Sequence, residues 1–520
     1  MAEETFELKT ASRMIRLYPG NGRLPLECEM ILPEYKEGVH RVLRPEAHPV
    51  IRSKSLYLQA GTAVMEVQGA LDLTLLYFGE EERDRVRSFS SRESFTFTFR
   101  TPVPDGVVDE GSLCGAVEAS VENLSFKLMG PRRILLRADL FLQADMKANE
   151  SFSFVEEPCA KDVFVRGEGA ACTRILSSTK GDFVLEERVV LPQGCLPVEE
   201  IVSLTPRLFA DQVRCENGGI SFRVLCDLDI SYLAAEERSL ISVCQPVEIT
   251  RRMGLSECSE DSMADLRLSA EEVKYHLDVD ESGEMRVICV EMTYSAHALL
   301  YGREKLFVLE DAFSTDCDLS LSFAEESWET HLGNGEFCLD RREEIEFPTE
   351  GIVRTEAVTA EFRVREAALA EGKLLLDGKL CFSCLGITAD GETVKMEGTR
   401  ESRVTLPPLQ GLTLPDRECR IEIATVTRSP DLAVEAGKVK LRFELCGYAA
   451  LFLKEKRKTV SSLSRGERLP RREEGLVYLY PEEGESLWSI CKKYHVSPHL
   501  VQEENGLSDE ALPRVLHFCL

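Results

Sequence analysis

Apolar strands that recur three times along the chain are the feature that most restricts its fold. Leu26–Pro33 (LECEMILP) matches Leu185–Pro192 (LEERVVLP), and Ile345–Pro348 (IEFP) closes a third, weaker copy. Each segment is an apolar run that ends at a proline, which has no N–H to give to a sheet and therefore stops pairing. The prolines recur about 155 to 160 residues apart, roughly the length of one domain. The sequence therefore predicts three domains of one kind in tandem.

Each copy also contains a strand in which apolar residues alternate with other residues. A period of two marks a strand that buries one of its faces. Helical periodicity is scarce in the three copies, so we predict a mainly β fold in which each copy is an antiparallel β-sandwich. The alternating runs are Gly69-x-Leu71-x-Leu73, Cys226-x-Leu228-x-Ile230 and Gly378-x-Leu380-x-Phe382.

The repeats and the composition divide the chain into five predicted segments. The three β repeats are expected at residues 1–150, 151–330 and 331–453. Residues 454–474 contain many basic residues, a glycine and a proline but no apolar periodicity, which predicts a basic linker. The charge of this linker has two interpretations, a solvated tether or a contact with the acidic repeats or an anionic surface. Residues 475–520 form the fifth segment.

The charge and the cysteines limit the partners and the compartment. The 520 residues include 62 Lys plus Arg and 90 Asp plus Glu, a formal net charge of −28. Nucleic-acid binding needs a basic surface, so we expect no nucleic-acid partner. The 18 cysteines stand mostly singly in apolar runs such as Val224–Cys226, which is typical of unpaired, buried thiols in a reducing compartment. With no secretory signal and no apolar run long enough to span a membrane, we expect a cytoplasmic protein without a transmembrane segment.

Residues 475–520 carry the helical pattern that the rest of the chain lacks. Ser486 is a predicted N-cap, with Ser489 three positions later, and the apolar residues that follow are spaced for one helical face. Ser497 and Pro498 have the residue types that cap and begin a second helix, and Asn505-Gly506 tolerates the positive φ that ends it. Short apolar strands flank the two helices, at Val477–Tyr480 and Val515–Phe518. The predicted order is therefore βααβ.

This segment resembles the LysM module, through GESLWSI from Gly484, KYHVS from Lys493 and Asn505-Gly506-Leu507. The resemblance implies binding of N-acetylglucosamine-containing glycans between the loop before the first helix and the loop after the second. The candidate binding residues are then Gly484, Glu485, Ser486 and Leu487 in the first loop, and Asn505, Gly506, Leu507 and Pro513 in the second. Alternatively, these residues have structural roles, with Leu487 in the core of the module and Asn505-Gly506 in a turn. The ligand also has an alternative, a protein in place of a glycan.

The repeats resemble the SPOCS domains of endospore-forming Firmicutes, through Val67-x-Gly69-x-Leu71-x-Leu73 with Tyr77. In the second and third copies we expect Ala234 and Gly386 at the place of the tyrosine. SPOCS-like repeats followed by one LysM module are the layout of SipL-like spore coat morphogenetic proteins. This resemblance implies a chain at the forespore surface, in the mother-cell cytosol and the spore coat. It implies that the LysM module docks to a coat morphogenetic ATPase and that other spore coat proteins are partners.

The sequence shows no arrangement that predicts catalysis, a metal site or a cofactor. Cys381 and Cys384 form a lone CxxC inside an alternating strand, where positions i and i+3 face opposite ways. His495 and His499 lie on either side of a helix break. Ser489-x-x-Lys492 fits S-x-x-K only within the first LysM-like helix. We therefore expect no enzyme.

Two functions remain open from the sequence. The first is a non-enzymatic scaffold or adaptor in spore coat assembly. The alternative is a cell-envelope protein that binds peptidoglycan or another N-acetylglucosamine-containing glycan through the LysM module, with the repeats as spacers. A LysM-targeted hydrolase would need a catalytic group that the sequence does not show.

Overall fold

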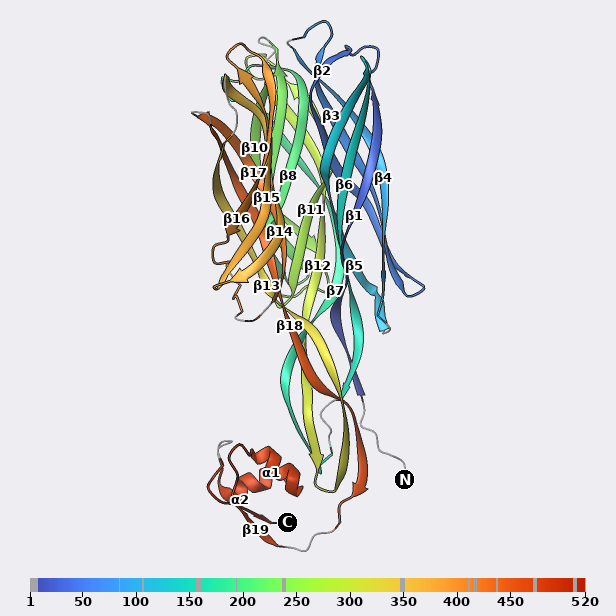
Figure 1. The fold of residues 1–520 in the computed structure, drawn as a ribbon, viewed down its shortest axis with the longest axis vertical. Coiled ribbons are helices and arrows are strands. Elements are labelled where there is room, and N and C mark those ends of the chain that lie inside the picture. The colour runs from blue at the N-terminus through green and yellow to red at the C-terminus, as the bar shows by residue number, and fades with distance from the viewer. Residues whose placement is uncertain are drawn as a thin grey trace.

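The computed structural model has a mainly β fold of antiparallel sheets with two short helices, as predicted. Three groups of six strands lie side by side and form an elongated body, and the C-terminal residues form a small module near one end (Figure 1). The structure describes residues 8–519 apart from 84, 105–106, 156–159, 193, 236–239, 347–350, 410–411, 416, 418, 436–437, 471–474 and 508–511.

The first group, sandwich 1, consists of two three-stranded antiparallel sheets. One sheet has the strand order β1-β6-β5 and the other has the order β2-β3-β4. The strands are β1 (Leu8–Ile31), β2 (Val39–Gln59), β3 (Thr62–Gly79), β4 (Val86–Pro102), β5 (Val107–Gly130) and β6 (Arg133–Val155).

Sandwich 2 and sandwich 3 repeat this topology strand for strand. Their sheets have the orders β11-β12-β7 and β10-β9-β8, then β13-β18-β17 and β14-β15-β16. Sandwich 2 contains β7 (Val163–Val190), β8 (Val198–Glu216), β9 (Gly219–Ala234), β10 (Leu240–Gly254), β11 (Met263–Asp278) and β12 (Val287–Ser314). Sandwich 3 contains β13 (Cys317–Glu346), β14 (Ile352–Ala370), β15 (Lys373–Thr388), β16 (Thr393–Thr405), β17 (Cys419–Glu435) and β18 (Lys438–Arg468).

Each sandwich encloses its own core between its two sheets. The alternating residues that mark the central strands in the sequence lie in these cores, since a strand directs every second side chain to the same face. Gly69 has no room for a side chain, because a Cβ there would lie 2.3 Å from the ring of Phe95. Gly378, at the corresponding place in sandwich 3, packs in the same way against Phe362.

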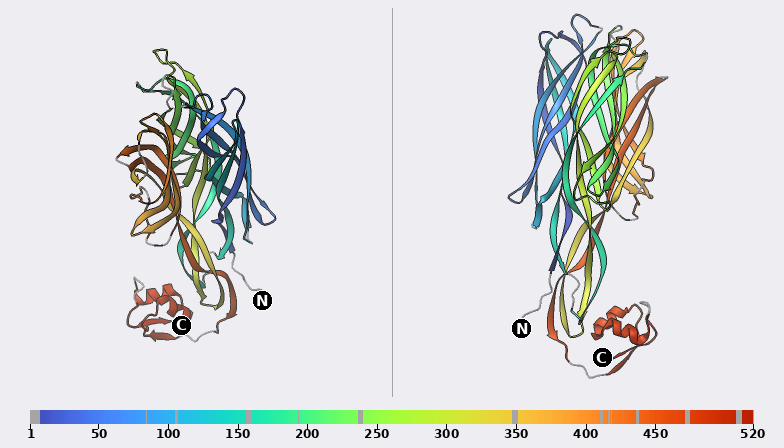
Figure 2. Two further views of the ribbon diagram at one scale, coloured as in Figure 1. Left: turned by 45° about the horizontal axis from the view of Figure 1, so that its top comes forward. Right: turned by 180° about the vertical axis from the view of Figure 1, so that it is seen from behind.

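The first and last strands of each sandwich continue beyond it as a two-stranded ribbon. The three ribbons wind around one another below the sandwiches, and we call this part the stalk (Figure 1 and Figure 2). It comprises residues 8–16, 147–155, 163–175, 301–314, 317–331 and 452–468, paired as β1/β6, β7/β12 and β13/β18. Ala11, Cys172 and Trp328, one from each ribbon, share a buried cluster. The stalk therefore joins the three sandwiches through common side-chain packing.

The predicted basic linker is wrong for most of its length. Residues 454–468 continue β18 and pair with β13. Lys454, Lys456 and Lys458 are exposed, whereas Val460 and Leu463 are buried against β12. Charged side chains occupy every position from 454 to 458, so the sequence shows no apolar alternation there although the segment is a strand. Residues 471–474 of the predicted linker lie outside the described residues.

Two predicted boundaries and two residue assignments also change. The boundary after residue 150 falls inside β6, and that after residue 330 falls inside β13, because both strands extend into the stalk. Cys338 and Cys446 form a disulfide across β13 and β18, although the cysteines were expected to be unpaired. Sandwich 2 also has the tyrosine that Ala234 was expected to replace: Tyr232 corresponds to Tyr77 of sandwich 1.

The equivalence of Tyr77 and Tyr232 is visible in their bonds. Each lies two residues before the end of its central strand, β3 or β9. The hydroxyl of Tyr77 donates to the carbonyl oxygen of Glu37 at 3.2 Å, and that of Tyr232 donates to Leu196 at 3.1 Å. The alignment with Ala234 at this place was therefore wrong by two residues, which a strand of period two cannot reveal by its pattern alone.

Candidate functional site

The C-terminal residues fold into a small module at the end of the stalk, which we call the tail module. It contains β19 (Leu476–Leu479), α1 (Leu487–Tyr494), α2 (Pro498–Asn505) and β20 (Leu516–Cys519), with β19 antiparallel to β20. Its buried core consists of Leu487, Ile490, Cys491, Val501, Leu516 and Phe518. Phe313 of β12 belongs to the same cluster, so the stalk completes the core of the module.

The first helix begins as its sequence predicts. The Ser486 hydroxyl accepts the backbone N–H of Ser489 at 3.1 Å, and the Ser489 hydroxyl accepts the N–H of Ser486 at 2.9 Å. This capping box satisfies N–H groups that a helix leaves without partners at its start. Gly484, at φ 89°, turns the chain before it. The helix ends at His495, whose φ of 51° is in the left-handed region.

The second helix is held to the sheet by one side chain. Asn505 donates to the carbonyl oxygens of Val501 at 2.8 Å and His517 at 2.6 Å, and its oxygen accepts the N–H of His517 at 2.9 Å. Gly506 follows at φ 60° and caps the helix. The three hydrogen bonds that the Asn505 side chain makes to described residues are thus internal to the module and favour a structural role.

The two predicted binding loops differ in what they expose. In the first loop, Gly484 and Ser486 are exposed, Glu485 is half-buried and Leu487 is buried. In the second, Gly506 is exposed, while Asn505, Leu507 and Pro513 are half-buried. Within the described residues no hydrogen bond joins one loop to the other, and residues 508–511 of the second loop lie outside the description. The exposed candidates for a ligand are therefore Gly484, Ser486 and Gly506.

The outer face of α1 packs against the end of the β7/β12 ribbon. The indole N–H of Trp488 donates to a carboxylate oxygen of Asp311 at 2.8 Å, and its ring centre lies 5.0 Å from that of Phe313, edge to face. Phe313 in turn stacks on Phe164 at 5.4 Å, and the guanidinium of Arg166 lies 5.7 Å from the Trp488 ring. Trp488 is therefore half-buried among aromatic and charged groups of the stalk.

Two further residues of the same helix face reach the ribbon. Lys492 forms an ion pair with Asp311, and the Nδ1 of His495 donates to the carbonyl oxygen of Ser314 at 2.8 Å. Trp488 and Lys492 lie at positions i and i+4 of α1, and we call these two residues together with the C-cap His495 the stripe of α1. The stripe meets successive residues of one strand end, so that the tail module has a defined orientation on the stalk.

The charge of Asp311 is central to this contact. Burial alone would raise the pKa of Asp311, but the hydrogen bonds from Lys492 and Trp488 outweigh burial and hold its pKa below the usual value. The carboxylate is therefore ionised at neutral pH while it accepts both donors. Asp311, Phe313, Phe164 and Arg166 were not predicted as site residues, because no local pattern links them to a helix that lies far away in the sequence, 177 positions after Asp311 and further still after Phe164 and Arg166.

The residues considered for catalysis are engaged elsewhere. Cys384 is buried in the core of sandwich 3, and Cys381 is half-buried on the opposite face of β15. The Ser489 hydroxyl also donates to the carbonyl oxygen of Ser486, and Lys492 is bound to Asp311. His499 is exposed on α2, with its Nδ1 3.7 Å from Glu503, whereas His495 faces the stalk.

A cleft of about 810 Å³ lies between sandwiches 2 and 3. Two of its acidic groups are bound within the protein: Asp211 binds Arg223, and the Glu336 carboxylate accepts the N–H groups of Gln212 at 2.8 Å and Val213 at 3.0 Å. Burial and a hydrogen bond with Asp211 raise the pKa of Glu336. The two bonds to Glu336 cross from sandwich 2 to sandwich 3, so the cleft is a polar seam of the body.

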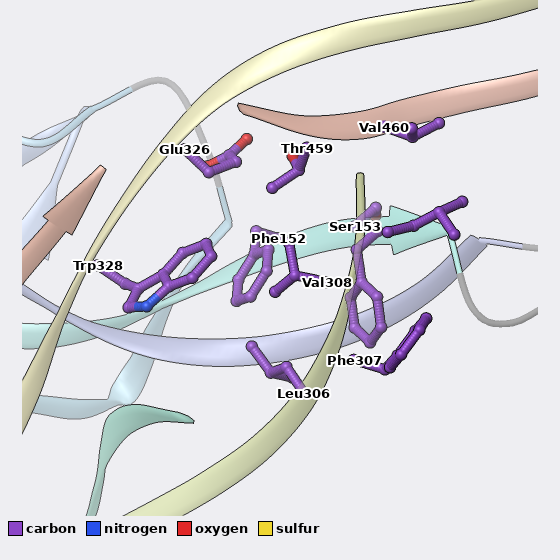
Figure 3. A pocket seen from close by; sticks show the side chains of 11 residues that line it. Phe152, Ser153, Leu306, Phe307, Val308, Glu326, Trp328, Thr459 and Val460 are labelled. Carbon is purple, nitrogen blue, oxygen red and sulfur yellow. The ribbon is translucent and has the colours of Figure 1, made fainter. Parts of the chain in front are cut away.

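A much smaller pocket lies inside the stalk (Figure 3). Phe152, Leu306, Val308, Trp328 and Val460 surround it, with contributions from all three ribbons. Its volume of about 20 Å³ is near that of one water molecule, too small for an organic ligand.

Comparison with known proteins gives no relative: no family model, curated protein or solved structure matches this chain. In the part of the chain that the structure describes, neither helix is long and apolar enough to cross a membrane.

Proposed function

We propose that this chain is a non-enzymatic scaffold or adaptor in spore coat assembly. In this proposal the tail module, which resembles LysM, docks to a coat morphogenetic ATPase on the forespore surface, and the SPOCS-like sandwiches recruit other spore coat proteins in the mother-cell cytosol. The observation that carries it is the division of the molecule into three like sandwiches, joined through the stalk, and one small module packed on the far end of the stalk.

The geometry suits an adaptor for two reasons. The sandwiches have edge strands and loops that extended partners can use, and they present them on a long body. The tail module lies at the opposite end from the sandwich tips, so one partner at each end does not exclude the other (Figure 1). Two weak contacts on one chain can together exceed either affinity by about 10² to 10⁴.

Deleting residues 475–520 tests the role of the module in sporulating cells. We expect the truncated chain to remain folded, because the cores of the sandwiches contain no residue of the module. We expect it to lose recruitment to the forespore surface. Normal localisation of a folded, truncated chain would exclude the proposal.

The second candidate ligand is a glycan that contains N-acetylglucosamine, bound in the wall of the cell envelope. The exposure of Gly484, Ser486 and Gly506, from the two loops that the resemblance assigns to glycan binding, favours it. Titrating chitin oligomers into the full chain separates the two ligands. Saturable binding supports the glycan, and a flat titration together with loss of recruitment on deletion supports the protein partner.

A further inference from the structure

The stripe of α1 that carries Trp488, Lys492 and His495 is occupied by the chain's own stalk. The end of β12 presents a carboxylate at Asp311 and an aromatic ring at Phe313 to this stripe. Residues two apart on a strand point to the same side. The side chains of Asp311 and Phe313 therefore face the stripe together, from backbone positions roughly 6 to 7 Å apart.

The local structure of the strand end fixes the directions of these two side chains. The register of β12 with β7 slips between Leu309 and Asp311, which marks a bulge. Bulges redirect a side chain at the end of a strand. The Asp311 side chain also accepts the N–H of Ala312 at 2.9 Å, which fixes its direction. Phe164 supports the ring of Phe313 from behind.

On the helix side, each group of the stripe has a matching partner. The indole N–H and the ammonium of Lys492 converge on one carboxylate, while the indole ring meets the ring of Phe313. Tryptophan is one of the residues enriched among the few that contribute most of the binding energy in protein interfaces, and a charge-assisted hydrogen bond beside it adds specificity. The stripe thus has the composition of a recognition site.

We propose that this stripe of α1 is a recognition site for an extended protein segment with an acidic residue two positions before an aromatic one, and that the Asp311–Phe313 end of β12 is an internal copy of that ligand. The inference rests on the proposed function only in taking the partner to be a protein. A partner that carries this acidic–aromatic pair reaches the stripe by displacing the stalk.

The stalk has an advantage over a free segment in binding the stripe. A ligand in the same chain acts at an effective concentration in the millimolar range when the connection is short. The tail module follows β18 after only the segment between Arg468 and Leu476. A free segment of the same affinity therefore competes poorly with the intact stalk, and weakening the stalk contact opens the stripe.

The two tryptophans of the chain make the opening measurable in the full protein. Incorporating 5-fluorotryptophan gives two ¹⁹F resonances: Trp488 reports the contact, and Trp328, buried within the stalk, serves as an internal control. We expect Asp311→Asn to move the Trp488 resonance toward its solvent-exposed position and leave that of Trp328 unchanged. Glu310→Gln, a matched loss of one charge next to Asp311, should leave both resonances in place.

The ligand is tested with the peptide acetyl-Gly-Glu-Asp-Ala-Phe-Ser-Gly-amide. We expect Asp311→Asn to bind it at least tenfold more tightly than the wild-type chain, as followed by the Trp488 resonance. A peptide with Asp and Phe exchanged should bind neither protein. Phe313→Ala is a second way to open the stripe, for which the same gain is expected.

Two results would overturn the inference. The first is a Trp488 resonance that is equally exposed in the wild-type chain and in Asp311→Asn. The second is equal binding of both peptides, or of neither, by the opened chain. These measurements use the purified chain without coat proteins, so their failure leaves the recruitment experiment above unaffected and is distinguishable from failure of the proposed function.

Discussion

The ammonium of Lys147 lies 2.8 Å from a carboxylate oxygen of Glu422, and the two residues belong to sandwiches 1 and 3. Lys147 is buried and Glu422 is half-buried where the sandwiches meet. Lys147 also bonds the hydroxyl of Tyr301 from sandwich 2 at 3.1 Å, and Glu422 pairs with Arg420. Burial alone would raise the pKa of Glu422, but the charges of Lys147 and Arg420 outweigh burial and lower it to about 2. Lys147 therefore connects the three sandwiches, through an ion pair with Glu422 and a hydrogen bond with Tyr301.

Removing either charge should destabilise the junction strongly. Lys147→Met leaves Glu422 with one cation less, and Glu422→Gln leaves a buried ammonium without its main partner. Breaking one side of a buried pair costs about 3 to 5 kcal/mol, and we expect each variant to lower the free energy of unfolding by about 3 kcal/mol in urea titrations. The double variant should lose at least 1 kcal/mol less than the sum of the two.

The exposed pair Arg403–Asp377 provides the control, because surface ion pairs contribute roughly 0 to 1 kcal/mol. Arg403→Met should therefore have a small effect. Additive losses in the Lys147 and Glu422 variants would contradict a direct coupling between the two residues.

Acid should destabilise the chain through His331. This ring has no exposed surface and stacks on Phe452, and its Nε2 donates to Asn334 at 2.7 Å. Burial lowers the pKa of His331 to about 4, below the value of about 6.5 in an unfolded chain. Between these values the unfolded state binds more protons, so stability is complete above about pH 6.5 and falls as the pH drops toward 4.

The difference between the folded and unfolded pKa values of His331 sets the size of this loss of stability. Between pH 7 and pH 5, His331 should account for a loss of about 2 kcal/mol in the free energy of unfolding. We expect His331→Phe, which keeps a ring against Phe452, to reduce the pH dependence by that amount in urea titrations at the two values. An unchanged pH dependence would show that His331 is protonated without cost in the folded chain.

Asn505 should prove to be a structural residue of the tail module. Its side chain makes three hydrogen bonds that join α2 to β20. Asn505→Ala leaves buried groups unpaired, at a cost of about 1 to 3 kcal/mol, and should accelerate amide hydrogen exchange throughout the module but not in the sandwiches. Leu500→Ala, at an exposed position on the same helix, should leave exchange unchanged. Normal protection in Asn505→Ala would return this residue to the list of ligand-binding candidates.

Local patterns predicted the elements of this chain well where one residue determines the local conformation. Ser486 with Ser489 capped the first helix, Gly506 ended the second, and the alternation at Leu71 and Leu73 marked a central strand. Such features depend on a few neighbouring residues, whose hydrogen bonds and φ values are decided within one turn or one strand.

The stalk and the docking of the tail module could not be predicted in the same way. Val460 and Leu463 are buried by β12, yet charged residues on the outer face of β18 dominate their surroundings in the sequence. The contact between Asp311 and Trp488 joins residues 177 positions apart. This contact depends on where the β7/β12 ribbon ends and on how the chain after β18 returns to that ribbon. The periodicity of apolar residues within one segment predicts neither.

The equivalence of Tyr77 and Tyr232 can be tested by removing one oxygen from each. In Tyr77→Phe the carbonyl of Glu37 loses its donor, and in Tyr232→Phe the same happens to Leu196. We expect each variant to lower the free energy of unfolding by about 1 kcal/mol in urea titrations, the usual contribution of one hydrogen bond. Tyr478→Phe removes the same atom from an exposed side chain and should change stability by less than about 0.5 kcal/mol. A loss confined to Tyr77→Phe would mean that only sandwich 1 uses the tyrosine to hold the loop between its first two strands.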